Sequence, residues 1–400
     1  MCGRIGWPQG PYGLDLLEYQ GKQLFARHGV PVPDGEVAST VDEAVAAAEK
    51  VGFPCVIKAQ VQIGGRGKAG GIKIAEDGGE AREAAEAIIG MDIRGPRGEG
   101  PFKVHEVWVE GASEIESEYY ASMILDRSEK KVLAMLSAIG GMNVEEIAER
   151  DPEALVRTHI EPLDGGLSVD QARKLATDSG IDAAGVDGVA EAMVKVGEMF
   201  GATDATLVEI NPLVLTKDDR VIALDSKVTI DNNALFRHED LAELGNPADE
   251  DPLERMAKEK GLTYVKLDGD VGILANGAGL CMSTLDVVAQ AGGAPANFLD
   301  AGGGSKADAI VDALTVITSD EAVTAILFNI FGGITRCDEI AKGIIEASNR
   351  IDIDVPMVVR LDGTNSEEGL GLLADADLDD LHVEKTMLGA AEKVVEMAGA

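Results

Sequence analysis

Short apolar runs alternate with helical segments over the last third of the chain, and this alternation limits the possible folds more than any other feature. The runs end in glycine-containing turns, as in VGILANG (271–277), TAILFNIFGG (324–333) and PMVVRLDG (356–363). Strands that alternate with helices predict a parallel, doubly wound sheet. Ligands bind such sheets at the carboxyl ends of the strands, which is where these glycines lie.

The first 228 residues follow a different pattern, in which helices are mixed with antiparallel strands. Apolar spacing predicts one helix over residues 14–29, and several later runs alternate as strands do. The stretch 239–254 is acidic and contains the turn pairs Asn-Pro and Asp-Pro, which are typical of a linker or a surface segment. We therefore expect two domains, over residues 14–250 and 255–400.

The chain is strongly acidic. Its 71 acidic and 35 basic residues give a formal net charge of −36. Nucleic acids and anionic membranes bind basic surfaces, so neither is an expected partner. No apolar run reaches the roughly 18 residues that span a bilayer, and no secretory signal is evident. The 4 cysteines are widely spaced, which predicts reduced thiols and a cytoplasmic protein.

A glycine-rich loop, IGGRGKAGG (63–71), lies between two strand-like runs. It contains a GxGxxG match, but a dinucleotide fingerprint needs a helix next, and here the strand-like GIKIA (71–75) follows. A glycine hairpin can bind phosphate oxygens through its backbone N–H groups, with charge supplied by Lys58, Arg66 and Lys68. A mobile surface hairpin is the alternative interpretation.

Glu209, Asn211 and Asp225 form a candidate metal site. Residues 206–228 predict a hairpin, and Glu209 and Asn211 share one face of its first strand. An odd-numbered turn centred on Asp218 would put Asp225 opposite Asn211, whereas a two-residue turn would put it on the other face. Converging oxygen-bearing side chains suit Mg²⁺. A solvated sheet face is the alternative.

The run VWVE (107–110), followed by Ser113 and Glu118, is a weaker signal. A strand that leaves a domain with a free backbone edge can bind an adenine, and carboxylates can accept hydrogen bonds from ribose hydroxyls. Taken alone, the run is better interpreted as an ordinary strand followed by an acidic turn.

Two turns of the strand–helix region are candidate anion sites. GGIT (332–335) precedes a predicted helix over 336–348, and NGAG (276–279) precedes another over 280–291. The N-terminal amides and the dipole of each helix favour an anion. Tight strand-to-helix turns are the alternative, but two such loops at one sheet edge favour a ligand crevice.

These features occur together in a specific order. The motifs are EYQ-x-K-x-LF-x-R-x-G (18–29), IKAQV-x-x-GGRGKAGG (57–71), EINPL (209–213), NALFRH (233–238), NGAGL (276–280), PANFLD-x-GGG (295–304) and NIFGGITRCD (329–338). With this set the sequence resembles the β subunits of succinate–CoA ligases, also called succinyl-CoA synthetases. The resemblance extends from about residue 14 to the C-terminus.

The resemblance implies an N-terminal ATP-grasp module and a C-terminal CoA-ligase domain with a flavodoxin-like sheet. It also implies a reversible ADP-forming reaction of the citric acid cycle, in which ATP, succinate and CoA give ADP, phosphate and succinyl-CoA. In this family the phosphorylated histidine and the CoA site belong to an α subunit. The chain would then bind ATP or ADP with Mg²⁺ and act in a hetero-oligomer.

The resemblance also assigns roles to individual residues. The phosphate-binding positions are Lys58, Gly65, Arg66 and Gly67, and the other nucleotide-contacting positions are Glu110, Ser113 and Glu118. The Mg²⁺ ligands are Asn211 and Asp225, and the carboxylate that meets the phosphohistidine is Glu209. The acyl-substrate positions, shared with the α subunit, are Asn276, Gly333, Ile334 and Thr335.

Two residues depart from the family pattern. Gln62 stands where many relatives have His, and Ser226 stands where Gly or Ala is frequent. Neither replaces a matched ligand. Proline at the position of Pro33 goes with ATP-using relatives, so the resemblance favours ATP over GTP. A malate–CoA ligase β subunit and a catalytically inactive nucleotide- or acyl-binding regulatory module are the alternatives. The complete set of matched site residues argues against the second.

Overall fold

The computed structural model describes residues 13–95, 100–160, 166–245, 251–302, 307–378 and 380–399. The chain divides into two compact units, Met1–Gly245 and Asn246–Ala400, each with its own hydrophobic core. Part of the expected linker, residues 246–250, and part of the predicted glycine turn, residues 303–304, lie outside the described residues.

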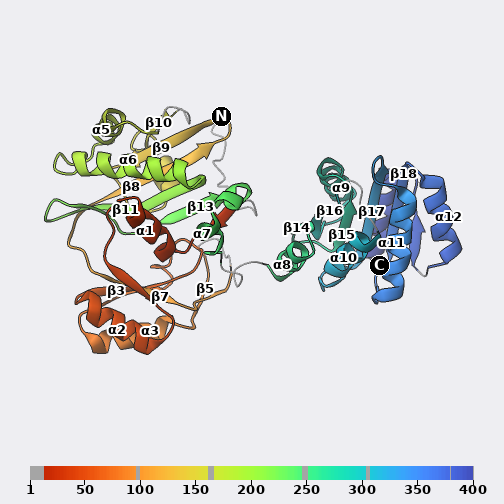
Figure 1. The fold of residues 1–400 in the computed structure, drawn as a ribbon, viewed down its shortest axis with the longest axis horizontal. Helices are drawn as coiled ribbons and strands as arrows, with labels where there is room; N and C mark the ends of the chain where they lie inside the picture. Colours follow the sequence, from red (N-terminus) through yellow and green to blue (C-terminus); the bar gives the residue numbers. More distant parts are fainter. Residues whose placement is uncertain are drawn as a thin grey trace. The chain divides into compact units, whose positions relative to one another are not determined.

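The smaller sheet of the first unit is antiparallel. Its strands lie in the order β2 (Gly35–Ala38), β7 (Val107–Gly111), β3 (Cys55–Ala59) and β4 (Ile72–Ala75). Helices α2 (Val41–Val51) and α3 (Gly78–Ile88) cover one face, over Cys55 and Ile57 (Figure 1). Because side chains alternate along a strand, Lys58 points to the opposite face. The glycine loop joins β3 to β4, which confirms the predicted hairpin.

The larger sheet of the first unit is also antiparallel. Its strands lie in the order β1 (Gly13–Asp15), β13 (Lys227–Asp231), β11 (Ala205–Thr216), β8 (Ile115–Asp126), β9 (Lys131–Ser137) and β10 (Val156–Ile160), with β12 (Val221–Ala223) beside β11. Helices α5 (Val169–Asp178) and α6 (Val186–Ala202) pack on one face, where Val208 is buried (Figure 1). Glu209 and Asn211 therefore lie on the other face.

The predicted helix over residues 14–29 is wrong at its start. Gly13–Asp15 is strand β1, which pairs with β13, and helix α1 is Glu18–Arg27. The apolar spacing placed the start of the helix too early because Leu14 packs against the same core as the helix. The helix begins where the side chain of Gln20 accepts a hydrogen bond from the Leu17 N–H at 2.9 Å.

The β11 hairpin has the odd-numbered turn. Leu213 pairs with Ala223, so the paired residues are centred on Asp218. The pairing of β11 with β13 continues the same register. This register places Asp225 opposite Asn211, as the odd-numbered turn predicts.

The second unit is a doubly wound sheet with helices on its two faces (Figure 1). The strands lie in the order β14 (Thr263–Lys266), β16 (Asn297–Asp300), β15 (Val271–Ala275), β17 (Ala325–Gly332), β18 (Met357–Gly363) and β19 (Leu381–Val383). All neighbouring pairs are parallel except that of β14 with β16. The parallel strands have the flavodoxin-like order, which was predicted. The order reverses between β15 and β17, and ligands bind such sheets at that point.

The helices of the second unit are α8 (Pro252–Glu259), α9 (Ala278–Gln290), α10 (Ala307–Thr318), α11 (Cys337–Arg350), α12 (Ser366–Ala376) and α13 (Met387–Ala398). The remaining elements of the first unit are β5 (Asp92–Ile93), β6 (Phe102–Lys103), α4 (Val144–Arg150), a 3-10 helix (Asn232–Arg237) and α7 (Glu239–Ala242). Within the described ranges, no helix has the length and apolar character to cross a membrane.

Candidate functional site

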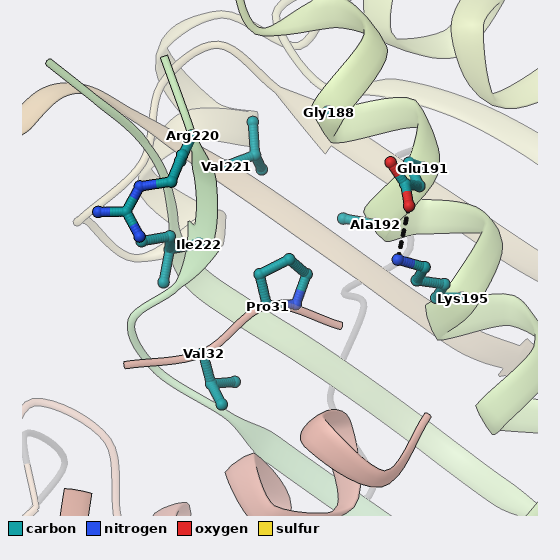
Figure 2. A pocket seen from close by; sticks show the side chains of 9 residues that line it. All are labelled: Pro31, Val32, Gly188, Glu191, Ala192, Lys195, Arg220, Val221 and Ile222. Carbon is teal, nitrogen blue, oxygen red and sulfur yellow. Dashed lines mark hydrogen bonds and ion pairs between the residues drawn. The ribbon is translucent and has the colours of Figure 1, made fainter. Parts of the chain in front are cut away.

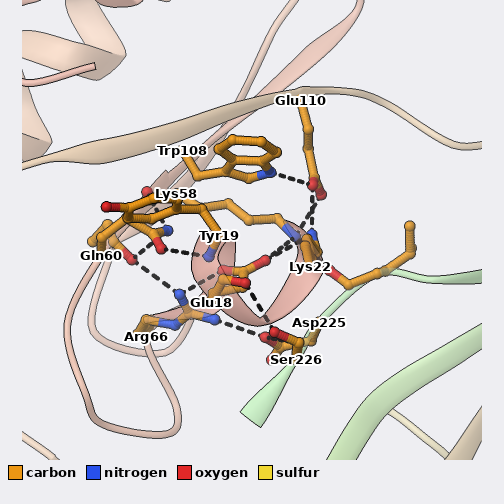
Figure 3. Close-up of polar contacts among 12 residues, drawn as sticks. Glu18, Tyr19, Lys22, Lys58, Gln60, Arg66, Trp108, Glu110, Asp225 and Ser226 are labelled. Atoms are coloured by element: carbon orange, nitrogen blue, oxygen red, sulfur yellow. Dashed lines mark hydrogen bonds and ion pairs between the residues drawn. The ribbon is translucent and has the colours of Figure 1, made fainter. Parts of the chain in front are cut away.

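Charged side chains gather where helix α1, the smaller sheet and the segment between β12 and β13 meet (Figure 3). We call this group the charged cluster, and its members are Glu18, Lys22, Lys58, Arg66, Glu110 and Asp225. All except Asp225 have side chains that are no more than 10% exposed. The cluster contains as many cations as carboxylates, which is the condition under which charges can be buried together.

Lys58 is held from three sides. Its Nζ lies 3.0 Å from Glu18 Oε1 and 2.6 Å from Glu110 Oε1, and it donates to the Leu224 carbonyl at 2.7 Å. Although burial opposes it, the carboxylates of Glu18 and Glu110 raise the pKa of Lys58 above its ordinary value. The ammonium therefore stays charged at neutral pH, as a phosphate-binding lysine must.

Arg66 brings the glycine loop into the cluster. Its Nη1 lies 2.5 Å from Glu18 Oε2 and donates to the Ala59 carbonyl at 3.0 Å. Its Nη2 donates to Asp225 Oδ1 at 2.9 Å. The loop residue Gly65 has φ +75°, a conformation that glycine adopts without strain. The predicted phosphate-binding arginine and metal-binding aspartate are thus in direct contact.

Glu110 has a different environment from the one the sequence indicates. Strand β7 pairs with β2 on one edge and with β3 on the other, so the backbone of Val107–Gly111 has no free edge, and the ordinary-strand interpretation is right there. The Glu110 carboxylate points into the cluster, where Lys22 and the Trp108 indole N–H (2.7 Å) contact it. Ser113 is half-buried and Glu118 is exposed, its carboxylate beside Gly141.

Asn211 and Glu209 lie on the sheet face that α5 and α6 leave uncovered. The Asn211 Oδ1 accepts a hydrogen bond from the Gly141 N–H, and its Nδ2 donates to the Met142 carbonyl, both at 2.8 Å. Glu209 pairs across the sheet with Lys227. Burial raises the pKa of Glu209, an effect that Lys227 opposes. Asp225 is 35% exposed, so a ligand can reach it.

The donor types of Asn211 and Asp225 fit Mg²⁺. An amide oxygen and a carboxylate are hard oxygen ligands, and Mg²⁺ takes one or two protein carboxylates together with waters and phosphate oxygens. In the part of the chain that the structure describes, no group of three or more His, Cys, Asp or Glu residues could hold a metal by itself. Two protein oxygen donors leave the other coordination positions of a Mg²⁺ ion to waters and phosphate oxygens.

Two loops at the reversal point of the second sheet are joined by reciprocal hydrogen bonds. The Asn276 Nδ2 donates to the Phe331 carbonyl, and the Asn276 Oδ1 accepts from the Phe331 N–H, both at 2.9 Å. Gly333 has open space where a side chain would lie. Ile334 is 87% exposed, whereas Thr335 is buried. The loops thus present the open space at Gly333 and the exposed side chain of Ile334 at the predicted ligand edge.

Asp338 fixes the end of the second of these loops. Hydrogen bonds from Arg336 lower the pKa of Asp338 to about 2, with help from Asn365 at 3.0 Å. This carboxylate stabilises the fold fully above its ordinary pKa, and the contribution disappears as the pH falls toward 2.

We expect Asp338→Asn to lower the free energy of unfolding by about 1–2 kcal/mol at pH 7 and by much less near pH 2, where part of the carboxylate is protonated in the folded chain. Thermal unfolding across this pH range measures the difference. Asp352→Asn, at an exposed position on the same unit, is the control and should change nothing. An equal loss at both pH values would contradict the assignment of the low pKa.

A separate hollow lies between the segment after α1 and helix α6 (Figure 2). Its lining residues are Pro31, Val32, Gly188, Glu191, Ala192, Lys195, Arg220, Val221 and Ile222. None of the predicted site residues, all of which the structure describes, is among them. The charged cluster and not this hollow is the candidate site of the first unit.

Sequence reasoning missed Glu18 and Lys22. They are four residues apart on α1, and such a pair is typical of a solvent-exposed helix face. Here the two side chains are each 1% exposed and 2.8 Å apart. The motif EYQ-x-K contained both residues, but nothing in its spacing distinguishes a buried pair from an exposed one.

The two units match two family models. Residues 15–215 match the ATP-grasp domain, and residues 274–394 match the CoA-ligase. The structure of ATP citrate lyase from Methanothrix soehngenii, in complex with citrate and coenzyme A, shares the fold with a TM-score of 0.73 and 17% identity. The match covers 96% of this chain and 100% of the lyase chain. The chain is therefore of the ATP-grasp and CoA-ligase class.

Curated relatives define the family more narrowly. The succinate–CoA ligase [ADP-forming] subunit beta of Rubrobacter xylanophilus is 51% identical over 385 residues, which is 96% of this chain and 99% of that protein. The subunit of the same name from Natronomonas pharaonis is 50% identical over 386 residues, again 96% and 99%. The chain belongs to the family of ADP-forming succinate–CoA ligase β subunits.

Proposed function

We propose that this chain, as a succinate–CoA ligase β subunit of the citric acid cycle, binds Mg·ATP and forms part of the succinate site. The enzyme converts ATP, succinate and CoA reversibly to ADP, phosphate and succinyl-CoA. Residues 14–250 bind the nucleotide, and residues 255–400 contribute to the acyl site. The observation that carries this proposal is the convergence of Lys58, Arg66 and Asp225 in the charged cluster.

Lys58 and Arg66 contact the nucleotide phosphates, with backbone N–H groups from Gly65 and Gly67. Local cations are needed because the chain as a whole, at −36, repels a triphosphate. Ile74, 64% exposed, lies on the same sheet face as Lys58 and offers an apolar surface for a purine.

The other nucleotide positions act in different ways. Ser113 and Glu118 can exchange hydrogen bonds with ribose hydroxyls. Glu110 acts through Lys58, because its carboxylate is turned into the cluster. Asn211 and Asp225 hold Mg²⁺, which supplies positive charge to the phosphate oxygens when it is bound.

The chain itself supplies positioning and electrostatic stabilisation rather than a nucleophile. None of its histidines, all of them within described segments, belongs to the charged cluster or the acyl loops: His28, His105, His159, His238 and His382. The phosphorylated histidine belongs to an α-type partner subunit, which also binds CoA. Glu209 accepts a hydrogen bond from that imidazole and so orients it.

The acyl loops bind succinate at the carboxyl ends of β15 and β17. The open space at Gly333 and the start of α11 suit a carboxylate, because a helix N-terminus favours an anion. Ile334 and Thr335 flank this position, and Asn276 fixes the neighbouring backbone of Phe331. Succinate has a carboxylate for this site and a second one for phosphorylation.

The test is thioester formation from ATP, CoA and succinate, by the chain alone and with a cognate α-type subunit. We expect activity only with the partner and a preference for succinate over malate as the parallel substrate. A preference for malate would overturn the substrate assignment but leave the proposed mechanism unchanged. No turnover with a demonstrably bound partner would overturn the enzymatic role.

We expect Asn276→Ala to raise the KM for succinate about tenfold or more, since two hydrogen bonds of about 1 kcal/mol each hold the Phe331 backbone. Steady-state kinetics with the partner subunit measures this. The KM for ATP should not change, and Asn349→Ala, at an exposed position on α11, is the matched control. An unchanged KM for succinate would exclude a role of Asn276 in the acyl site.

A further inference from the structure

Two buried charges on helix α1 have no part in the function proposed above. Glu18 and Lys22 are each 1% exposed, and a charge buried to this extent is costly unless it is paired. Both lie in the first turns of α1, whose end is held by the apolar core around Leu24 and Phe25. A rigid helix thus places two charges inside the proposed nucleotide site.

Glu18 contacts every cation of the charged cluster. Its Oε1 lies 2.8 Å from Lys22 Nζ and 3.0 Å from Lys58 Nζ, and its Oε2 lies 2.5 Å from Arg66 Nη1. Lys22 in turn reaches Glu110 Oε2 at 2.5 Å. One carboxylate therefore links the strand lysine and the loop arginine, which come from different elements, to a single helix (Figure 3).

Arg66 depends on this link more than Lys58 does. Lys58 lies on strand β3, whose backbone is fixed by pairing on both edges. Arg66 lies in the loop between β3 and β4, and its guanidinium is fixed by Glu18, Asp225 and the Ala59 carbonyl. Without Glu18, the guanidinium would keep two of these three anchors.

The backbone of Glu18 also reaches the metal side of the site. Its carbonyl accepts a hydrogen bond from the Ser226 Oγ at 2.8 Å, and the Ser226 N–H donates to Asp225 Oδ1 at 2.8 Å. The helix comes so close that a Cβ at Gly21 would lie 2.2 Å from the Ser226 Oγ. Ser226, which departs from the family pattern, thus connects the start of α1 to Asp225.

We propose that Glu18 is a positioning residue of the nucleotide site, which holds Arg66 and Lys58 in the geometry that binds phosphate without touching the nucleotide itself. Lys22 balances its charge so that the two phosphate-binding cations are not fully neutralised by Glu18 and Glu110. This inference rests on the proposed nucleotide site, and it adds to that site two residues from a helix outside both sheets.

The test compares two routes to the phosphorylated partner subunit in the assembled complex. One route uses Mg·ATP, and the other uses succinyl-CoA with inorganic phosphate and needs no nucleotide. We expect Glu18→Gln to raise the KM for ATP about tenfold or more, and to leave phosphorylation from succinyl-CoA within twofold of the unaltered complex. Glu36→Gln, at a surface ion pair of the smaller sheet, should change neither route.

The outcomes separate this inference from the proposed function. An unaltered complex that is phosphorylated by neither route would contradict the proposed function itself. An unchanged KM for ATP, or equal losses by both routes in Glu18→Gln, would overturn the positioning role and leave the proposed function standing.

A compensated variant covers the case in which Glu18→Gln fails to fold. Glu18→Gln combined with Lys22→Met removes one anion and one cation, so the cluster stays neutral. We expect this variant to fold and still to show the raised KM for ATP, because Arg66 still lacks its anchor. Full recovery of the KM for ATP would mean that charge balance, and not positioning, is the role of Glu18.

Discussion

Asp225→Ala is expected to lower Mg-dependent phosphorylation of the partner subunit by roughly 10³-fold or more while the chain stays folded. Asp225 is 35% exposed, so its charge is the least buried of the cluster. Arg66, its partner, keeps its contacts with Glu18 and the Ala59 carbonyl when Asp225 is lost. Transfer of phosphate from labelled Mg·ATP to the partner, followed by circular dichroism of each variant, measures both parts of this expectation.

Matched variants separate charge from contact at this position. Asp225→Asn keeps an oxygen that can accept from Arg66 and from the Ser226 N–H, but it removes the negative charge that a divalent cation requires. We expect it to fold like the original chain and to lose most of the phosphotransfer. Asp218→Ala, at the 60% exposed hairpin turn, should retain full activity. Undiminished phosphotransfer in Asp225→Ala would exclude the metal assignment.

Local patterns predicted those parts of the fold in which neighbouring residues decide the outcome. The strand–helix alternation predicted the parallel, doubly wound sheet, since each apolar run is long enough for one buried strand. The hairpin itself was predicted, but its register was open between two turn lengths until the structure showed the odd-numbered turn centred on Asp218.

The charged cluster could not be predicted in the same way, because its contacts join residues far apart in the sequence. Glu18 and Lys58 are 40 residues apart, and Arg66 and Asp225 are 159 apart. The direction of the Glu110 side chain likewise depends on Lys22 and Lys58, and no pattern within β7 reveals it. The phosphate-binding role of Lys58 and Arg66 could be predicted from residue type and from the resemblance. The side chains that contact these two cations could not be predicted.

The partners determine how the cluster responds to the loss of a cation. Lys58→Met is expected to lower the free energy of unfolding by about 3–5 kcal/mol, because breaking a buried pair leaves uncompensated charge. Glu18 would keep Lys22 and Arg66, and Glu110 would keep Lys22 and the Trp108 N–H, so three carboxylates would share two cations. Thermal or urea unfolding of the chain measures the loss. Lys50→Met, at a 70% exposed lysine of α2, should stay within about 0.5 kcal/mol of the original chain.

A second substitution separates the stability of the cluster from its function. Lys58→Met combined with Glu110→Gln restores the balance of charge, so we expect it to recover most of the lost stability. It should not recover nucleotide binding, because the phosphate-binding ammonium is still missing. Titration calorimetry with Mg·ADP on the folded double variant tests this. Near-normal affinity of the double variant for Mg·ADP would mean that Lys58 serves the fold alone. If the single Lys58→Met variant were as stable as Lys50→Met, the stability of the cluster would not depend on its charge balance.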